Sequence, residues 1–137
     1  MGRITYVTIA GKNYPMSFSL GASKKIIGKF GSAEKMKTQL KKSTNEEQID
    51  LVTDILELLI AQGCAYKNYF EKDFPAPEDA PIVNGKWEPL PREAIEIGVG
   101  ISEVEDLVSK ITSCIDVGSK KEVETRIDGK NAKSGQE

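Results

Sequence analysis

The stretch between residues 45 and 72 most constrains how this chain can fold. Its apolar residues recur at alternating steps of three and four, which is the spacing of one face of an α-helix. This stripe consists of Ile49, Val52, Leu56, Leu59, Gly63, Tyr66 and Phe70, and a second stripe beside it consists of Leu51, Ile55 and Leu58. Together they cover more than the face of about 100° that a surface helix usually buries. The helix is therefore predicted to be central to the fold, which we favour, or to be shared with another subunit.

Two local signals refine this prediction. Thr44 is followed three residues later by Glu47, which is the spacing of a capping box, so the helix is expected to begin there. Gly63 costs about 1 kcal/mol inside a helix, and a kink or break is expected at this residue.

The residues before this helix predict a β-hairpin over residues 3–18. Its first half is rich in β-branched and aromatic residues, and residues 10–13 supply turn chemistry. Tyr14, Met16 and Phe18 then alternate with other residues, which is typical of a half-buried strand. A lone hairpin is marginal in water, so something must pack on it.

Two short helices are expected between the hairpin and the long helix, at about 20–30 and 33–42. Gly31 is placed to end the first of these helices, and Ser32 is placed to cap the second.

A proline-rich connection over residues 74–91 opens the second half of the chain. Its five prolines remove backbone donors and exclude regular helix. Within the connection, Asn84 and Gly85 favour a tight hairpin turn.

Two further helices are expected, at 91–99 and 103–117. Residues 95–101 alternate like a strand but also continue a helical stripe, and we favour a helix that breaks near its glycines. Ser102 and Glu105 have the spacing of a second capping box, which favours a fresh helix start.

These elements predict an α+β fold that is mostly α-helical, with an N-terminal β-hairpin followed by a small helical bundle and a proline-rich loop with a hairpin. The length of 137 residues suits one globular domain, expected over residues 1–118. Residues 119–137 have few apolar side chains and alternating charges, and they are expected to form a disordered tail.

The sequence contains no histidine, which removes the commonest general base and the commonest transition-metal ligand. No phosphate-binding loop, dinucleotide fingerprint, zinc motif or EF-hand loop is present. Cys64 and Cys114 lie fifty positions apart, which is not a metal or redox spacing, and they are expected to be buried free thiols. The chain is therefore expected not to be an enzyme, and no catalytic, cofactor-binding or metal-binding residue is predicted.

Charge is segregated along the chain although the net charge is only −2. Residues 23–42 contain seven Lys and one Glu, whereas residues 43–80 contain nine acids and two Lys. The basic helices could pack beside the acidic helix within one molecule, which we favour. Alternatively, the two charged regions could pair head to tail between subunits.

Partner-binding residues are sought among the aromatic and apolar side chains. Trp87 lies at a hairpin between prolines, where it is expected either to cover the core or to anchor a partner. The other candidates are Tyr66, Tyr69, Phe70, Leu51, Ile55 and Leu58.

Several stretches resemble one known family, namely residues 4–24, 63–70, 75–81, 120–124 and 129–133. They are similar to small tail assembly chaperones of siphophages and prophages of Gram-positive bacteria, which are encoded between the major tail protein and the tape measure protein. The resemblance covers nearly the whole chain and includes no catalytic signature.

This resemblance implies a mostly helical protein of the host bacterial cytoplasm that coats the tape measure protein and recruits the major tail protein. It also implies self-association and absence from the mature virion. Many such chaperones have a second, longer form made by a programmed frameshift. Gly129-Lys130-Asn131 could be encoded by a slippery heptamer, so this hypothesis remains open beside that of an ordinary polar tail.

Two alternatives remain open at the level of sequence. One is a small regulatory nucleic-acid-binding protein that uses the lysines between Lys24 and Lys42, although this region contains no Arg and its one aromatic residue lies on an apolar stripe. The other is a structural tail-completion subunit of the virion. Membrane insertion is not expected, since the longest apolar stretch is far too short to span a bilayer.

Overall fold

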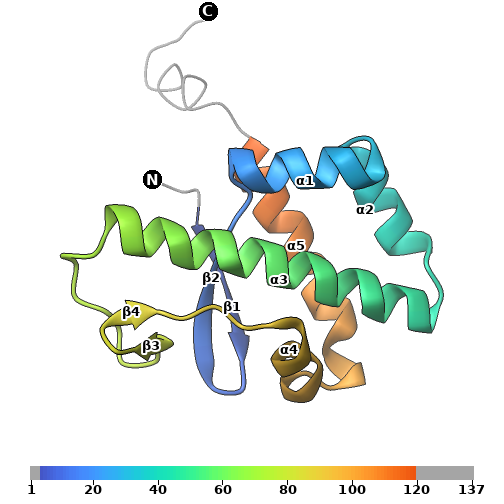
Figure 1. Cartoon of the computed structure of the whole chain (residues 1–137). Helices are drawn as coiled ribbons and strands as arrows, with labels where there is room; N and C mark the ends of the chain where they lie inside the picture. The colour runs from blue at the N-terminus through green and yellow to red at the C-terminus, as the bar shows by residue number, and fades with distance from the viewer. Residues whose placement is uncertain (1–3, 120–137) are drawn as a thin grey trace, which may run out of the picture.

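The computed structural model of the chain describes residues 4–119, except for the side chain of Asn45. Figure 1 shows two hairpins and five α-helices in this part of the chain. In chain order the elements are β1 (Ile4–Ile9), β2 (Lys12–Ser17), α1 (Leu20–Phe30), α2 (Ala33–Lys42), α3 (Asn45–Phe70), β3 (Ile82–Val83), β4 (Lys86–Trp87), α4 (Arg92–Gly98), the 3₁₀-helix η1 (Ile101–Glu103) and α5 (Val104–Ser119). The predicted mostly helical α+β fold is confirmed. Residues 120–137, which hold nearly all of the expected tail and the Gly129-Lys130-Asn131 tripeptide, lie outside the described residues.

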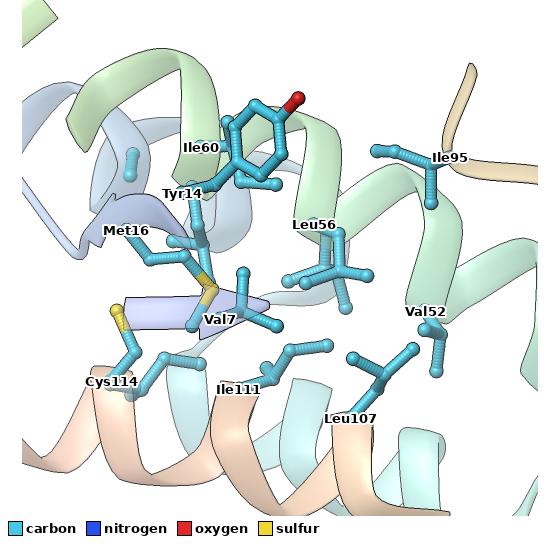
Figure 2. Packing of buried hydrophobic residues seen from close by; sticks show 14 of the residues in the cluster. Val7, Tyr14, Met16, Val52, Leu56, Ile60, Ile95, Leu107, Ile111 and Cys114 are labelled. Carbon is cyan, nitrogen blue, oxygen red and sulfur yellow. The ribbon is translucent and has the colours of Figure 1, made fainter. Parts of the chain in front are cut away.

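Helix α3 runs through the middle of the molecule, and the other elements pack around it (Figure 1). Leu56, Leu59 and Ile60 are completely buried, and Figure 2 shows Leu56 and Ile60 in the core that α3 forms with the hairpin and α5. The favoured prediction of a central helix is therefore confirmed.

Strand β2 is buried on both faces, which differs from the predicted half-buried strand. Tyr14, Pro15, Met16 and Ser17 are all buried. The reason is that α3 contacts β2 while α5 contacts both strands of the β1–β2 hairpin. The hairpin thus lies between two helices instead of forming a surface layer.

Gly63 does not break α3, contrary to the expectation from the sequence. The helix is continuous from Asn45 to Phe70. A Cβ atom at Gly63 would lie only 2.1 Å from the carbonyl oxygen of Pro15. The glycine therefore lets α3 lie directly on the backbone of β2, and this close contact explains its presence within a helix.

Both hairpins turn through residues in the left-handed region. Ala10 and Gly11 have φ values of 50° and 84°, and Asn84 and Gly85 have φ values of 54° and 80°. Two consecutive positive φ values are characteristic of a type I′ turn, so the Asn-Gly prediction is confirmed.

The helix ends follow local signals in part. Gly31 ends α1 with a φ of 97°, and Ser32 accepts a hydrogen bond from the Lys35 N–H at 3.0 Å, as predicted. Thr44 precedes α3 but its side chain makes no capping bond, so the expected capping box is absent. The side chain of Gln48 instead donates to the Leu40 carbonyl and joins the start of α3 to α2.

The expected capping box at Ser102 is also wrong. The N–H of Gly100 donates to the Glu103 carboxylate at 3.1 Å, two residues earlier than predicted. The shift arises because η1 precedes α5 and forms the first turn of this segment.

Candidate partner-binding surface

The last turns of α3 and the loop after it carry a group of aromatic side chains, here called the aromatic end and defined as Tyr66, Tyr69, Phe70 and Phe74. Tyr69, Phe70 and Phe74 are 78%, 72% and 65% exposed. Within the group, the ring centroid of Phe70 lies 5.3 Å from that of Tyr66 and 6.2 Å from that of Tyr69. Three predicted candidates therefore come together, and the exposed Phe74 follows them in the loop after α3.

The aromatic end is exposed because α3 extends past the hairpin that covers its middle (Figure 1). Tyr66 and Phe70 continue the same stripe that buries Leu56 and Leu59. The backbone of β2 meets α3 at Gly63, and the helix continues for seven further residues to Phe70. The sequence pattern predicts the apolar stripe of α3, but it does not indicate the residue beyond which the hairpin no longer buries that stripe.

Trp87 lies beside the aromatic end but is only 9% exposed. Its backbone N–H donates to the Asn68 side chain at 2.9 Å, and its carbonyl accepts from the same side chain at 3.0 Å. The structure therefore places Trp87 as a cover of the core, and its role as an exposed anchor does not fit this burial.

Lys67 joins three elements at this end of the molecule. Its ammonium lies 5.4 Å from the ring centroid of Tyr6 and 5.4 Å from that of Trp87, and it pairs with Glu71 at 2.9 Å. Burial acts to lower the pKa of Lys67, but the hydrogen bonds and charges of Glu71 and Tyr6 outweigh burial and hold the pKa above its ordinary value. The charged form therefore holds β1, β4 and α3 together beneath the aromatic end.

The remaining candidates belong to the core of the chain. Leu51 and Ile55 are buried, and Leu58 is partly buried against the same cluster. Ile55 and Leu58 line a groove between α1 and α3 together with Ile26. Leu51 and Ile55 thus offer little surface to a partner, because neighbouring elements of the same molecule cover the second stripe.

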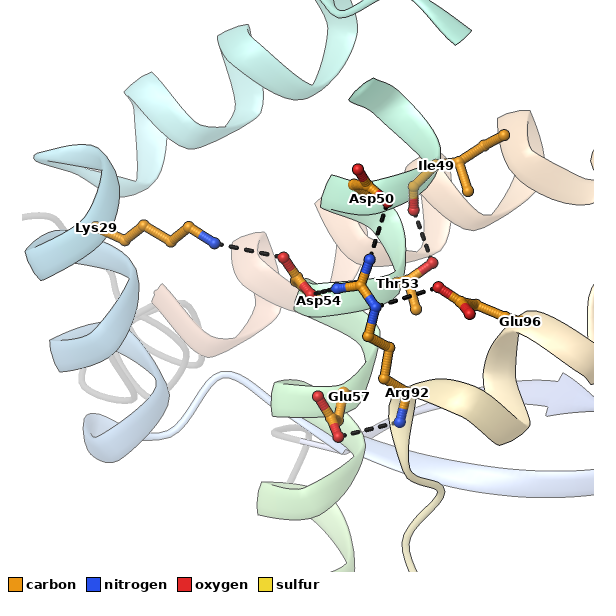
Figure 3. A network of polar contacts seen from close by, with 8 residues as sticks. All are labelled: Lys29, Ile49, Asp50, Thr53, Asp54, Glu57, Arg92 and Glu96. Atoms are coloured by element: carbon orange, nitrogen blue, oxygen red, sulfur yellow. Dashed lines mark hydrogen bonds and ion pairs between the residues drawn. The ribbon is translucent and has the colours of Figure 1, made fainter. Parts of the chain in front are cut away.

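A network around Arg92 was not foreseen from the sequence (Figure 3). Its guanidinium donates to Asp50 at 2.9 Å, to Glu96 at 3.1 Å and to Asp54. Its backbone N–H donates to Glu57 at 3.0 Å. These contacts hold α4 against the acidic face of α3, and Asp54 is also bound by Lys29 of α1.

The predicted packing of the basic helices beside the acidic helix is limited to few contacts. Lys29 on α1 pairs with Asp54 on α3 at 3.4 Å. Lys37 on α2 pairs with Asp116 on α5 at 2.7 Å. Arg92 from α4 provides most of the cationic contacts to α3, whereas Lys24 remains exposed on α1.

Both cysteines are buried and free, as predicted. Burial raises the pKa of Cys64 and of Cys114 to about 12. Thiols with so high a pKa are protonated near neutral pH and are poor nucleophiles.

Among residues 4–119, no group of three or more acidic, cysteine or histidine side chains is arranged to hold a metal ion. In the same part of the chain, no helix has the length and apolar character needed to cross a membrane.

Comparison with known proteins gives no matching protein-family model, and neither a curated protein nor a solved structure with significant similarity is found.

Proposed function

We propose that this chain is a non-catalytic phage tail assembly chaperone. It binds the tape measure protein in the host bacterial cytoplasm, recruits the major tail protein, and is absent from the mature virion. Two arguments support the proposal: the resemblance of residues 4–24, 63–70 and 75–81 that suggests this family, and an exposed surface suited to binding another protein.

The exposure of the aromatic end carries the proposal. Tyr69, Phe70 and Phe74 leave most of their rings in water, although burying one large apolar side chain stabilises a complex by about 1.5–3 kcal/mol. Aromatic side chains are also enriched among the residues that dominate protein interfaces. Their grouping provides a surface for apolar side chains of a partner.

The rigidity of the support fits the same role. Asn68 and Lys67 hold β4 and β1 against the base of the aromatic end through the contacts with Trp87 and Tyr6. A surface fixed in this way loses little conformational entropy on binding. A tape measure protein is a long helical protein whose apolar stripes would aggregate unless they were covered.

The test is co-expression with a tape measure protein, which the family resemblance leads us to expect in the neighbouring gene. We expect the tape measure protein to be soluble and to co-purify with the wild-type chain. The triple variant Tyr69→Ser, Phe70→Ser and Phe74→Ser should lose co-purification.

A matched triple variant, Tyr69→Phe, Phe70→Tyr and Phe74→Tyr, keeps three aromatic rings and should retain binding. Equal binding by the serine and aromatic variants would show that the aromatic end is not the contact surface. A tape measure protein that is insoluble with every version of the chain would contradict the proposed function itself.

The alternative of a structural virion subunit differs in one measurable outcome. Mass spectrometry of purified virions should lack this chain if it acts as a chaperone, and should contain it at a fixed ratio if it is a tail-completion subunit.

A further inference from the structure

An apolar groove lies between α3, α4 and the start of α5. It is here called the α4 groove. It has a volume of about 200 Å³, and its lining includes Ile49, Val52, Ile95, Val99, Ile101 and Leu107. Beside it, Ile97 is 79% exposed, and Ile101 in its lining is 71% exposed. In the sequence, Ile97 and Ile101 belong to the alternating pattern of residues 95–101. That pattern does not indicate that their side chains are exposed.

The surroundings of the α4 groove are acidic. Residues 93–106 contain five acidic residues and no Lys or Arg. Glu96 lines the groove and pairs with Arg92 at the start of α4, whereas Glu93, Glu105 and Asp106 are exposed on the elements that form the groove. An occupant should therefore combine apolar side chains with positive charge.

Helix α1 presents this combination on its outer face. Leu20 is 89% exposed, Ile27 is 53% exposed, and the exposed Lys24 lies between them. The three residues follow one another at helical steps of four and three, so they form one ridge, here called the α1 ridge. Residues 20–42 carry seven Lys and one Glu, so the charge around the ridge is opposite to that around the groove.

Gly28 adds an independent observation on this helix. A glycine in the interior of a helix is destabilising by about 1 kcal/mol relative to alanine. A Cβ atom at Gly28 would meet no other atom of the chain within 4 Å, so packing within the molecule does not require the glycine. The absent side chain leaves room for close approach of another molecule beside Ile27.

We propose that the α1 ridge of one copy of this chain docks in the α4 groove of the next copy. Since α1 and α4 lie on different sides of α3, docking leaves a free groove on one copy and a free ridge on the other (Figure 1). Such a head-to-tail contact does not close as a symmetric dimer, and further copies add to either end. The inference concerns a different surface from the aromatic end and does not rest on the proposed function.

The test uses two variants that each remove one side of the contact. Ile27→Asp places a negative charge on the ridge, and Ile101→Asp places one in the acidic groove. Light scattering coupled to size exclusion should show that the mass of the wild-type chain rises beyond a dimer with concentration. Each variant alone should be monomeric, with association at least about tenfold weaker.

Mixing the two variants gives the decisive result. Ile101→Asp retains its ridge and Ile27→Asp retains its groove, so the mixture should form a 1:1 dimer that does not grow. Both substitutions are at exposed positions, and circular dichroism should confirm that both variants are folded. Val83→Asp, an exposed β-branched residue on the β3–β4 hairpin, is the matched control and should associate like the wild type.

Several outcomes would overturn the inference: a wild-type chain that is monomeric at every concentration, a mass that stops at the dimer, or a mixture of variants that stays monomeric.

Raising the salt concentration should weaken the association several-fold, because it screens the attraction between Lys24 and the acidic surroundings of the groove. Loss of tape measure binding with intact self-association would contradict only the proposed function.

Discussion

Helix α3 has two parts that share one spacing of apolar residues and differ in what covers them. Between Leu51 and Cys64 the apolar side chains are buried or, as at Leu58, partly buried beneath the hairpin and the other helices, whereas Tyr69 and Phe70 in the last turn are mostly exposed. The same alternation of three and four residues runs through both parts. The pattern identifies a face of the helix, and the neighbouring elements decide whether that face becomes core or binding surface.

The boundary between the two parts lies near Gly63. At this residue α3 contacts the backbone of β2, and beyond it Tyr6 and Trp87 reach the helix from the side through Lys67, and Trp87 also through Asn68. Neighbouring elements therefore contact the exposed part of α3 from the side, whereas its last turn is exposed to solvent. This arrangement separates the residues that stabilise the fold from those available to a partner.

The largest expected effect comes from truncating one residue in each part. Leu56→Ala should lower the free energy of unfolding by about 3 kcal/mol, because the removed side chain is completely buried. Phe70→Ala should change it by less than about 0.5 kcal/mol, because most of its ring is already in water. Urea denaturation followed by circular dichroism measures both values, and similar losses would show that the two parts are not distinct.

The next effect tests the boundary itself. Gly63→Ala should lower the free energy of unfolding by about 2–3 kcal/mol, because the new methyl group would overlap the Pro15 carbonyl. The same substitution at Gly28, where the space is open, should raise the free energy of unfolding by about 1 kcal/mol. Thermal and urea unfolding of both variants gives the comparison, and a neutral Gly63→Ala would contradict the close packing of α3 on β2.

A smaller loss of stability is expected when the contacts that support the exposed end of α3 are removed. Asn68→Ala removes both hydrogen bonds to the Trp87 backbone and should lower the free energy of unfolding by about 1–2 kcal/mol. Gln39→Ala, which removes an exposed amide on α2, serves as the control and should have an effect below about 0.5 kcal/mol. Trp87 fluorescence should shift to longer wavelength in Asn68→Ala only, and an unchanged spectrum would argue against this support.

The last effect is absent at neutral pH, appears only at alkaline pH, and concerns Cys64 at the end of the buried part, together with Cys114. In the unfolded chain these thiols ionise near their ordinary pKa of about 9, whereas in the folded chain burial holds the pKa at about 12. Between these values the unfolded chain binds fewer protons, so the free energy of unfolding should fall as the pH rises above about 9. No contribution is expected below that pH.

The measurement for this effect is urea unfolding at several alkaline pH values. The double variant Cys64→Ala and Cys114→Ala should show a shallower fall than the wild type, since Tyr14, whose pKa burial also raises, is present in both chains. Identical slopes would mean that the thiols are not protected by the fold.

Local signals were sufficient for most of the elements. The hairpin turn at Asn84-Gly85, the end of α1 at Gly31 and the cap at Ser32 each depend on residues close in sequence, and each is confirmed. The predicted long helix over residues 45–72 ends two residues earlier, at Phe70.

Features that depend on distant residues could not be predicted in the same way. The role of Gly63 depends on Pro15, and the position of α4 depends on pairs between Arg92 and residues about forty positions earlier in α3. Of the candidate surface, the aromatic side chains of α3 could be identified from sequence. The burial of Trp87 and Ile55 and the exposure of Ile97 required the packed structure.

The coverage of β2 on both faces sets the order in which this chain can complete its fold during synthesis. The β1–β2 hairpin leaves the ribosome before the helices that cover it, but a two-stranded hairpin alone is marginal in water. One of its faces is covered when α3 has been made, and the other only when α5 has been made. These contacts join residues far apart in the sequence, which slows folding relative to a bundle of local contacts. A chain that stops before Val104 should therefore lack a stable hairpin, because α5 closes the core around the β1–β2 hairpin.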